Sequence, residues 1–428
     1  MPSTIDQASL RATGMPVLWR KRLARLAVAG LSAALLACGG GGGSSAGVGT
    51  GGTGSFAVGS VSGFGSVIVN GVHFDDSGAD VFDDDGNRSS SSALGLGMVV
   101  EIRGSVDDDG LAGTAQSISY YSELKGPVTA VDAGAGTVTV FGEVVSVTAT
   151  TVFEGVAGLA GIAVGNVVEV YGLPGASGTL VATRIEREAL TVGAYDGEFR
   201  VRGPLTGLSG TAPDQRFTVA SVTVTTDAGT EVEDGALVEG AYVSVRLATT
   251  AAGDGSYMAT RIRVKTRSYD DDVNEAEVEG LVSEFTSPDA PFKVNGYPVQ
   301  LGTSVSYEDG LAGDLADGVR VEVEGSVVDG VLIARKVEFE HEDDDGGADG
   351  SDAPFEFKGV ATCSTTPCSS PSGTFEVRGV TVHYDALTRF EDGVTLANLQ
   401  GSNVEVKAVS EIDSSGTIFR ATRIEPND

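Results

Sequence analysis

One pattern occurs five times along most of this chain, and it constrains the fold more than any other sequence feature. Each copy opens with a glycine inside a short apolar segment, namely VGSV, KGPV, RGPL, EGLV and KGVA. Successive opening glycines are 67, 77, 77 and 79 residues apart, and they are Gly59, Gly126, Gly203, Gly280 and Gly359. Since self-similarity of this kind is the signature of a repeat protein, we expect five copies of one structural unit.

Three further blocks follow each opening glycine in constant order. The first, as in SVIVNGVHF, alternates apolar and polar residues on both sides of a turn, and Asn70-Gly71 is a preferred pair for a type I′ hairpin. The second, as in GVRVEVEG, alternates valines with charged residues, which is typical of a half-buried strand. The third reads ATRI or a close variant. Copy three departs most, because Ala220-Ser221 replaces the turn pair and leaves its hairpin geometry open.

These blocks predict an all-β fold. Each unit of about 65 to 75 residues offers five short strands and shows no helical period. An open five-stranded sheet would leave two edges exposed, and closure into a barrel removes them. We therefore expect a tandem array of five small OB-like, five-stranded β-barrels. A small β-sandwich in each unit is the alternative.

The combined pattern G-x-V…V-x-V-N-G-x-x-[VF]…G-x-x-V-x-V…A-x-x-I resembles a domain of unknown function that occurs in tandem in proteobacterial lipoproteins. The resemblance covers nearly all of residues 56–428. It implies a secreted, lipid-anchored β repeat module without an assigned activity, and it supplies no functional residue to carry over.

Composition changes along the chain predict the domain organisation. Acidic, glycine-containing segments separate some units, and a stretch of Gly, Ser and Thr precedes the first. The expected parts are a signal peptide (1–37), a Gly/Ser-rich tether (38–54), repeats 1 to 3 (55–121, 122–194 and 195–268), an acidic linker (269–274), repeat 4 (275–340), a second acidic linker (341–352) and repeat 5 (353–428).

The N-terminus is typical of an export signal. The basic segment WRKRLAR precedes the uncharged residues 26–37, a run too short for the ~20-residue helix that crosses a bilayer. The junction resembles the bacterial lipobox, which implies cleavage before the cysteine and its acylation; it consists of Leu35, Leu36, Ala37 and Cys38. An ordinary secretory signal with an incidental cysteine is the alternative.

Two further residues refine this interpretation. Gly39 stands where an aspartate would resemble an inner-membrane retention signal, so we expect an outer-membrane lipoprotein of a Gram-negative cell envelope, facing the periplasm or the medium. A signal that starts at Met15 has a more usual length, and we expect translation to begin there.

Charge excludes one class of partner. The formal net charge is −32, and removing residues 1–37 takes away five basic residues and one acidic residue, which moves the charge to −36. Nucleic-acid binding depends on Lys and Arg that neutralise phosphates, so we expect no nucleic-acid partner. The chain is nevertheless 41% hydrophobic, which is enough to build cores.

The cysteines pair by elimination. Once Cys38 is assigned to the lipid, Cys363 and Cys368 remain, and an oxidising compartment permits a disulfide between them. A two-thiol metal or redox site is the alternative, but no further Cys or His lies nearby in the sequence to complete it.

Aspartate-rich turns are the strongest candidates for a binding site. Calcium prefers six to eight oxygen ligands, and these turns offer carboxylates, although none matches the EF-hand loop. Asp-Gly is also good turn chemistry, so solvated turns are the alternative. The candidate ligands are Asp83, Asp85, Asp107, Asp109, Asp343 and Asp345.

The sequence favours a protein that is not an enzyme. No HExxH, GxSxG, Walker A or dinucleotide motif occurs in its expected context. The leading hypothesis is a scaffold or adhesion module that contacts the membrane through its lipid and binds an envelope protein or a surface ligand, without a required cofactor. The alternatives are a calcium- or small-ligand-binding protein and a carboxylate-based hydrolase.

Overall fold

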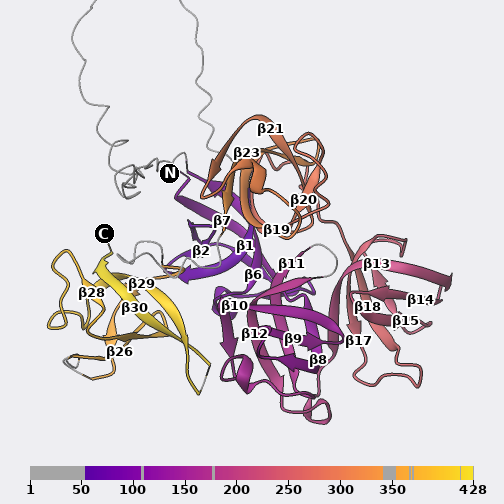
Figure 1. The fold of residues 1–428 in the computed structure, drawn as a ribbon, viewed down its shortest axis with the longest axis horizontal. Helices are drawn as coiled ribbons and strands as arrows, with labels where there is room; N and C mark the ends of the chain where they lie inside the picture. Colours follow the sequence, from indigo (N-terminus) through magenta and orange to yellow (C-terminus); the bar gives the residue numbers. More distant parts are fainter. Residues whose placement is uncertain are drawn as a thin grey trace, which may run out of the picture. The chain divides into compact units, whose positions relative to one another are not determined.

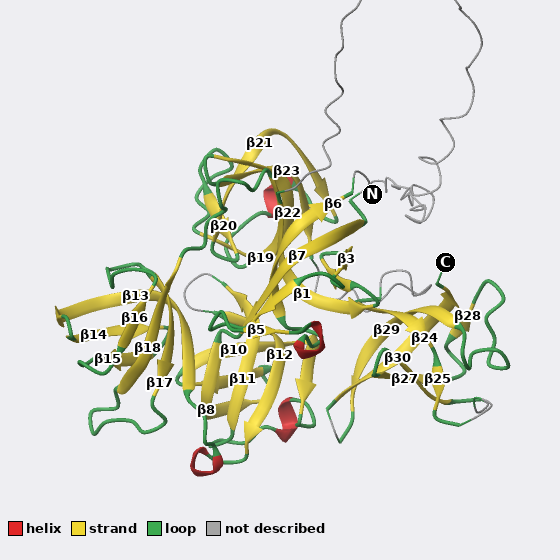
Figure 2. Ribbon diagram, turned by 180° about the vertical axis from the view of Figure 1, so that it is seen from behind, coloured by secondary structure: helices red, strands yellow, loops and turns green. Residues whose placement is uncertain are grey.

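The structure is a computed structural model that describes residues 54–107, 110–175, 179–340, 353–365, 368, 371–414 and 416–427. This part of the chain is built from β-strands joined by turns and a few short helical turns (Figure 1, Figure 2). None of its helices has the length and hydropathy that a membrane crossing requires. The predicted signal peptide, the tether up to residue 53 and the linker 341–352 lie outside the described residues.

The strands fall into five sets that follow the five sequence repeats. Repeat 1 has β1 (Ser55–Phe64), β2 (Val67–Val69), β3 (Val72–Asp75), β4 (Asp80–Phe82), β5 (Arg88–Ser89), η2 (Ser91–Ala93), β6 (Val99–Val106) and β7 (Ala112–Tyr121). Repeat 2 has β8 (Leu124–Asp132), β9 (Thr137–Val140), β10 (Glu143–Glu154), η3 (Leu159–Gly161), β11 (Val167–Pro174) and β12 (Leu180–Ala189). Repeat 3 follows η5 (Val192–Ala194) with β13 (Phe199–Thr211), β14 (Asp214–Val219), β15 (Val222–Thr225), β16 (Glu231–Glu233), β17 (Tyr242–Leu247) and β18 (Tyr257–Lys265).

The last two sets repeat this order. Repeat 4 has β19 (Glu275–Ser283), β20 (Phe292–Val294), β21 (Tyr297–Glu308), η6 (Ala312–Asp314), β22 (Arg320–Val328) and β23 (Val331–Phe339). Repeat 5 has β24 (Phe355–Val360), β25 (Thr362–Cys363), β26 (Gly373–Val377), β27 (Val380–Tyr384), β28 (Arg389–Phe390), β29 (Asn403–Ile412) and β30 (Thr417–Pro426).

The strand pairing closes each set into a barrel. In repeat 4, β19 pairs with β20, β20 with β21, β21 with β23, β23 with β22, and β22 with β19 again. Only the β21–β23 pair is parallel. The other four repeats give the same ring, in which the third strand pairs in parallel with the fifth. In repeat 5 the short β25, which follows β24, makes the pairing with β26. The predicted OB-like barrel is therefore confirmed, and the pairing does not support the alternative sandwich.

Alternation along the strands separates the barrel interior from its outer face. In β22, Val321 and Val323 are fully buried in the core, whereas Arg320 and Glu324 are only partly buried. Because successive side chains of a strand point to opposite faces, the period-two sequence pattern places the valines inside. Each barrel interior is filled by such apolar residues, which form three continuous hydrophobic clusters.

In four of the five repeats the opening glycine leaves room for the hairpin turn that follows it, and in repeat 3 Gly203 is favoured instead by its positive φ of 147°. The first residue of the hairpin turn packs onto the glycine of the first strand: a Cβ on Gly280 would lie 2.7 Å from the backbone nitrogen of Asn295, and one on Gly126 would overlap the ring of Phe141. These turn residues all have a positive φ of 50° to 55°; they are Asn70, Phe141, Ala220, Asn295 and Arg378.

The hairpin of copy three is intact despite its unusual turn residues. Ala220 adopts a φ of 50°, and Val219 pairs directly with Val222 across the turn. The strand pairing is thus kept, although Ser221 lacks the positive φ of 73° to 88° that the glycines at this turn position have in the other four copies.

A threonine on the third strand or in the loop after it bonds to the last strand in three repeats. Each threonine hydroxyl donates to the carbonyl of the alanine that opens the ATRI block. The Oγ1–O distances are 2.7 Å for Thr151–Ala182, 2.8 Å for Thr230–Ala259 and 2.9 Å for Thr388–Ala421. Such a bond satisfies a carbonyl where the ladder is interrupted, as at Val147/Val152 in β10.

The contact between turn and glycine predicts the effect of a single added methyl group. Gly126→Ala should lower the free energy of unfolding by about 1–3 kcal/mol, because the Cβ would overlap the Phe141 ring and overpack the site. Urea unfolding followed by circular dichroism measures this change. Gly193→Ala is the control, since a Cβ there meets no atom within 4 Å. Equal midpoints for the two variants would contradict the assigned role of the opening glycine.

Candidate functional site

The Asp-rich turn between β4 and β5 is held in shape by its first aspartate. The Asp83 carboxylate accepts hydrogen bonds from the backbone N–H groups of Asp85 at 3.0 Å and Asn87 at 2.8 Å. It also accepts one from the Asn87 side chain at 3.1 Å. Asp83 therefore caps its own turn, and Asp84 and Asp85 extend from it.

Asp84 is buried against arginines of repeat 3. Its Oδ1 lies 3.0 Å from Nη1 of Arg202, and its Oδ2 lies 3.0 Å from both Nε of Arg200 and Oγ of Ser244. The side chains of Asp84 and Arg202 are only 4% and 3% exposed. Burial alone would raise the pKa of Asp84, but Arg202 and Arg200 hold it below its ordinary value.

Asp85 extends the same contact toward the surface. Its carboxylate accepts two hydrogen bonds from the guanidinium of Arg246, through Nε at 2.8 Å and through Nη2, and a third from Nη2 of Arg200 at 3.2 Å. A carboxylate and a guanidinium that pair through two bonds form one of the stronger polar contacts in proteins. The turn of repeat 1 is thus bound by three arginines from β13 and β17.

A second buried ion pair adjoins the first. Nη2 of Arg267 donates to Oε1 of Glu123 at 2.7 Å and to the hydroxyl of Tyr242 at 2.6 Å, and that hydroxyl donates to Oε2 of Glu123 at 3.0 Å. The ring of Tyr121 lies beneath Arg202, 3.8 Å from its guanidinium carbon. We call these two ion pairs and their partners the inter-repeat charge network; its residues are Asp84, Asp85, Tyr121, Glu123, Arg200, Arg202, Tyr242, Ser244, Arg246 and Arg267.

In the turn between β4 and β5, the contacts described above engage the carboxylates that were predicted to bind calcium. The oxygens of Asp83 bind the turn itself, and those of Asp85 bind arginines. Asp107 begins the β6–β7 hairpin turn, where its backbone carbonyl accepts from Gly110 N–H at 2.9 Å. Asp109, Asp343 and Asp345 lie outside the described residues. Calcium binding by these aspartates stays a prediction.

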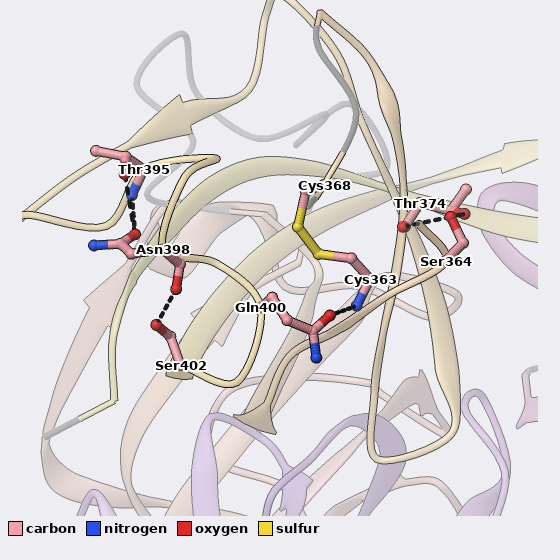
Figure 3. The surroundings of a disulfide bond; sticks show 8 residues. All are labelled: Cys363, Ser364, Cys368, Thr374, Thr395, Asn398, Gln400 and Ser402. Atoms are coloured by element: carbon pink, nitrogen blue, oxygen red, sulfur yellow. Dashed lines mark hydrogen bonds between the residues drawn. A yellow bond between two sulfur atoms is a disulfide. The ribbon is translucent and has the colours of Figure 1, made fainter. Parts of the chain in front are cut away.

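The two C-terminal cysteines form a disulfide in repeat 5, in agreement with the predicted pairing. The Cα atoms of Cys363 and Cys368 are 5.4 Å apart, within the usual range for a disulfide. The backbone N–H of Cys363 donates to the side-chain oxygen of Gln400 at 2.8 Å (Figure 3). The lipobox residues Leu35, Leu36, Ala37 and Cys38 lie outside the described residues.

His73 lies in a charged cluster that joins repeats 1 and 5. Its Nε2 is 3.3 Å from Oε1 of Glu356, and that oxygen is 3.1 Å from Nζ of Lys358. Lys407 also pairs with Glu356. Burial lowers the pKa of His73 to about 4, with help from Lys358 and Lys407, so the ring is neutral at pH 7. Its contact with Glu356 is therefore not an ion pair at that pH.

Three glutamates of repeat 2 form a cluster that the sequence did not indicate. Carboxylate oxygens of Glu169, Glu186 and Glu188 all lie within 4.8 Å of one another. Nζ of Lys125 is 2.6 Å from Glu169 and 3.2 Å from Glu188. A lysine ammonium thus supplies the positive charge beside these carboxylates. The alternation of β11 and β12 predicts outward side chains, but only the pairing of the two strands brings these together.

A pair of glutamates in repeat 4 shares a largely buried environment. Glu277 on β19 and Glu322 on β22 lie on adjacent antiparallel strands, diagonally and two pairs apart in the register. Burial raises the pKa of Glu277 to about 7, and burial together with Glu277 raises the pKa of Glu322 well above its ordinary value. At least one of the two carboxyl groups therefore holds a proton at mildly acidic pH.

A cleft of about 250 Å³ with both polar and apolar walls opens beside the first hairpin. Its walls carry hydroxyl, amide, carboxylate and guanidinium groups, including those of Ser60, Asn70, Thr148, Thr183, Glu279 and Arg320. Glu279 accepts from the backbone N–H of Ser60 at 2.9 Å and from Nε of Arg320 at 3.0 Å. Glu279 and Arg320 thus pair with each other within the cleft.

Removing the Asp84 charge tests whether the network stabilises the fold. Asp84→Asn should lower the free energy of unfolding by about 3–5 kcal/mol, because it leaves Arg202 buried without its partner. The control is Asp80→Asn, whose pair with Arg88 is exposed and should contribute at most about 1 kcal/mol. Thermal unfolding of both variants gives the comparison. Equal losses would contradict a special role for the buried pair.

The glutamate pair predicts a dependence of stability on pH. A carboxyl whose pKa is raised on folding destabilises the folded state above its unfolded pKa, and the loss grows until pH passes the folded value. For Glu277 that window runs from the ordinary value of 4.5 to about 7. Glu277→Gln should therefore melt at a higher temperature than the unaltered protein at pH 8, with a smaller difference near pH 4.5. A difference that does not change with pH would contradict the shifted pKa.

Comparison with protein families identifies the repeat. A model of a domain of unknown function, DUF5666, matches residues 57–119, 125–186, 202–263, 279–338 and 368–425. A comparison with curated proteins finds no match. Each matched segment contains strands of one of the five barrels. The chain therefore belongs to the DUF5666 family and carries this domain of unknown function in five tandem copies.

Proposed function

We propose that this chain is a lipid-anchored protein of the cell envelope whose five barrels form a non-enzymatic scaffold for binding another molecule. The proposal combines an export signal that ends at Cys38 with a folded array of repeats. Three acyl chains on the processed cysteine would anchor the protein stably, whereas a single chain binds a bilayer only marginally.

The inter-repeat charge network is the observation that supports a scaffold. Barrels that move independently of one another would need no buried contacts between them. Here the Asp84 carboxylate of repeat 1 is buried on Arg202 of repeat 3, and β1 pairs in parallel with β19 of repeat 4 from Ser55 to Val58. A binding surface composed of several barrels requires such contacts, because they hold the parts of the surface together.

The inter-repeat charge network also bears on whether the array catalyses a reaction. Several of the most buried charged groups in the described ranges are engaged in ion pairs, as Asp84 is with Arg202 and Glu123 is with Arg267. Neutralised pairs of this kind stabilise and orient neighbouring elements. The proposal therefore assigns binding, rather than a chemical step, to the array.

The anchor is tested by replacing the cysteine. In a Gram-negative host, Cys38→Ala should abolish incorporation of labelled fatty acid and release the protein from the membrane fraction, since no thiol remains to acylate. Ser45→Ala in the same tether is the control and should stay labelled. A Cys38→Ala protein that still takes up the acyl label would contradict the proposed anchor.

A further inference from the structure

The first strand of every repeat separates from the fourth strand at the same point. In repeat 2, the N–H of Val128 donates to the carbonyl of Asn166 at 2.8 Å, and its own carbonyl accepts from the N–H of Gly165 at 2.9 Å. The residues that make the same two bonds in the other repeats are Val61, Leu205, Val282 and Ala361. Beyond this point one edge of the first strand has lost its neighbour. We call the fourth to sixth residues after each opening glycine the first-strand edge; in repeat 2 these are residues 130–132.

A side chain of the same repeat caps the first-strand edge in repeats 3, 4 and 5. In repeat 3, the Glu239 carboxylate accepts from the backbone N–H groups of Gly207 and Leu208, both at 2.9 Å. The corresponding pairs are Asp317 with the N–H of Phe285 at 2.7 Å and Gln400 with the N–H of Cys363 at 2.8 Å. All three capping residues stand just before the glycine that opens the GVRVEVEG block of their repeat. We call this place in the sequence the cap position.

Repeats 1 and 2 have an apolar residue at the cap position, Leu96 and Val164, which cannot accept a hydrogen bond. In repeat 1 another strand takes the first-strand edge instead, because residues 63–64 pair in parallel with residues 356–357 of β24. Leu96 is only 6% exposed and belongs to the same hydrophobic cluster as Phe357 of that strand. An apolar cap position thus goes together with an added strand in repeat 1.

The first-strand edge of repeat 2 has neither a cap nor an added strand among the described residues. Residues 130–132 pair with β9 on one side, and no described residue outside the β8–β9 hairpin forms a hydrogen bond with them. Ala130 and Asp132 are exposed, Val131 is half-buried, and Val164 is 67% exposed. This edge is therefore open to solvent and lies beside an uncovered apolar side chain. Such an edge is a template for the addition of a strand.

Comparison with repeat 1 indicates which segment would fit. A Cβ built on Gly63 would overlap the carbonyl oxygen of Glu356, whereas repeat 2 has Ala130 at this place, so a strand added there must keep the ordinary ladder spacing of about 4.8 Å. Lys358 lies against Gly65 in repeat 1, and repeat 2 has Asp132 at the place of Gly65. A basic residue of the added strand would therefore lie beside a carboxylate.

We propose that the first-strand edge of repeat 2 binds an extended segment of a partner protein, which adds to β8 as a further strand. An aromatic or aliphatic side chain of this segment would cover Val164, as Phe357 joins the cluster of Leu96, and a basic residue would lie beside Asp132. Asp132 also disfavours a lone carboxylate in the manner of Glu239. The proposal rests on the binding role proposed above and names its surface and the kind of partner.

The test uses the full-length chain in a nonionic detergent and a fluorescently labelled peptide, Ala-Pro-Phe-Glu-Phe-Lys-Gly-Val-amide. This peptide has the sequence of residues 353–360, which contain the strand that takes the equivalent edge in repeat 1. Fluorescence anisotropy should show saturable binding, and hydrogen exchange followed by mass spectrometry should show slower exchange in residues 129–135. The peptide methylated at the backbone nitrogens of its Glu and second Phe should bind at least tenfold more weakly, because it lacks donors for the ladder.

Variants at the cap position locate the binding. Val164→Glu introduces the cap of repeat 3, and Val164→Gln introduces that of repeat 5 without adding a charge; each should weaken binding of the peptide at least tenfold. Val328→Glu makes the same change at a valine of repeat 4 that is 53% exposed, and this control should bind as the unaltered chain does. Melting temperatures verify that each variant is folded.

The outcomes separate this proposal from the proposed function. Absence of binding, equal binding of the methylated peptide, or unchanged binding in both Val164→Glu and Val164→Gln would overturn the edge site. Self-association of the chain in analytical ultracentrifugation that Val164→Glu abolishes would assign the edge to a second copy of the chain and would also overturn it. None of these results affects the lipid anchor, which the acyl-labelling experiment tests alone, and loss of that anchor leaves the peptide result unchanged.

Discussion

Burial of opposite charges between repeats is the constraint on which the arrangement of the barrels depends. The chain has 28 basic residues against 60 acidic ones, yet Arg202 and Arg267 are buried rather than left at the surface. Each is paired with a carboxylate and lies over a tyrosine ring, Tyr121 or Tyr242. Because an unpaired charge in such a place is costly, each ion pair ties the repeats that contribute its members.

Within a repeat, steric packing and backbone conformation, rather than charge, determine the fold. The first strand needs a glycine where the hairpin turn packs onto it, and the turn needs a residue that tolerates a positive φ. Asparagine, phenylalanine, alanine and arginine all occupy this turn position in different copies. The turn position therefore varies in chemistry, and in repeat 4 the asparagine at this position accepts a hydrogen bond from Arg267.

The sequence predicts the barrels well because their determinants are local and occur five times. The period-two valines and the Asn-Gly turns specify the strands and turns in which they lie, and the opening glycines precede the hairpin turns by only 11 to 19 residues. Cys363 and Cys368 are only five residues apart. The charge network could not be predicted, since Asp84 and Arg202 are 118 residues apart and an Asp-Gly turn that binds arginines has the same local sequence as one in water.

The central claim is that buried ion pairs make the array one scaffold. Hydrogen exchange followed by mass spectrometry, at increasing urea concentration, measures it most directly by reporting the opening of each repeat separately. The account predicts that the strands β6 and β7 of repeat 1 and the strands β13 and β17 of repeat 3 lose protection together, in one cooperative step. Loss of protection in repeat 3 while repeat 1 stays fully protected would contradict it.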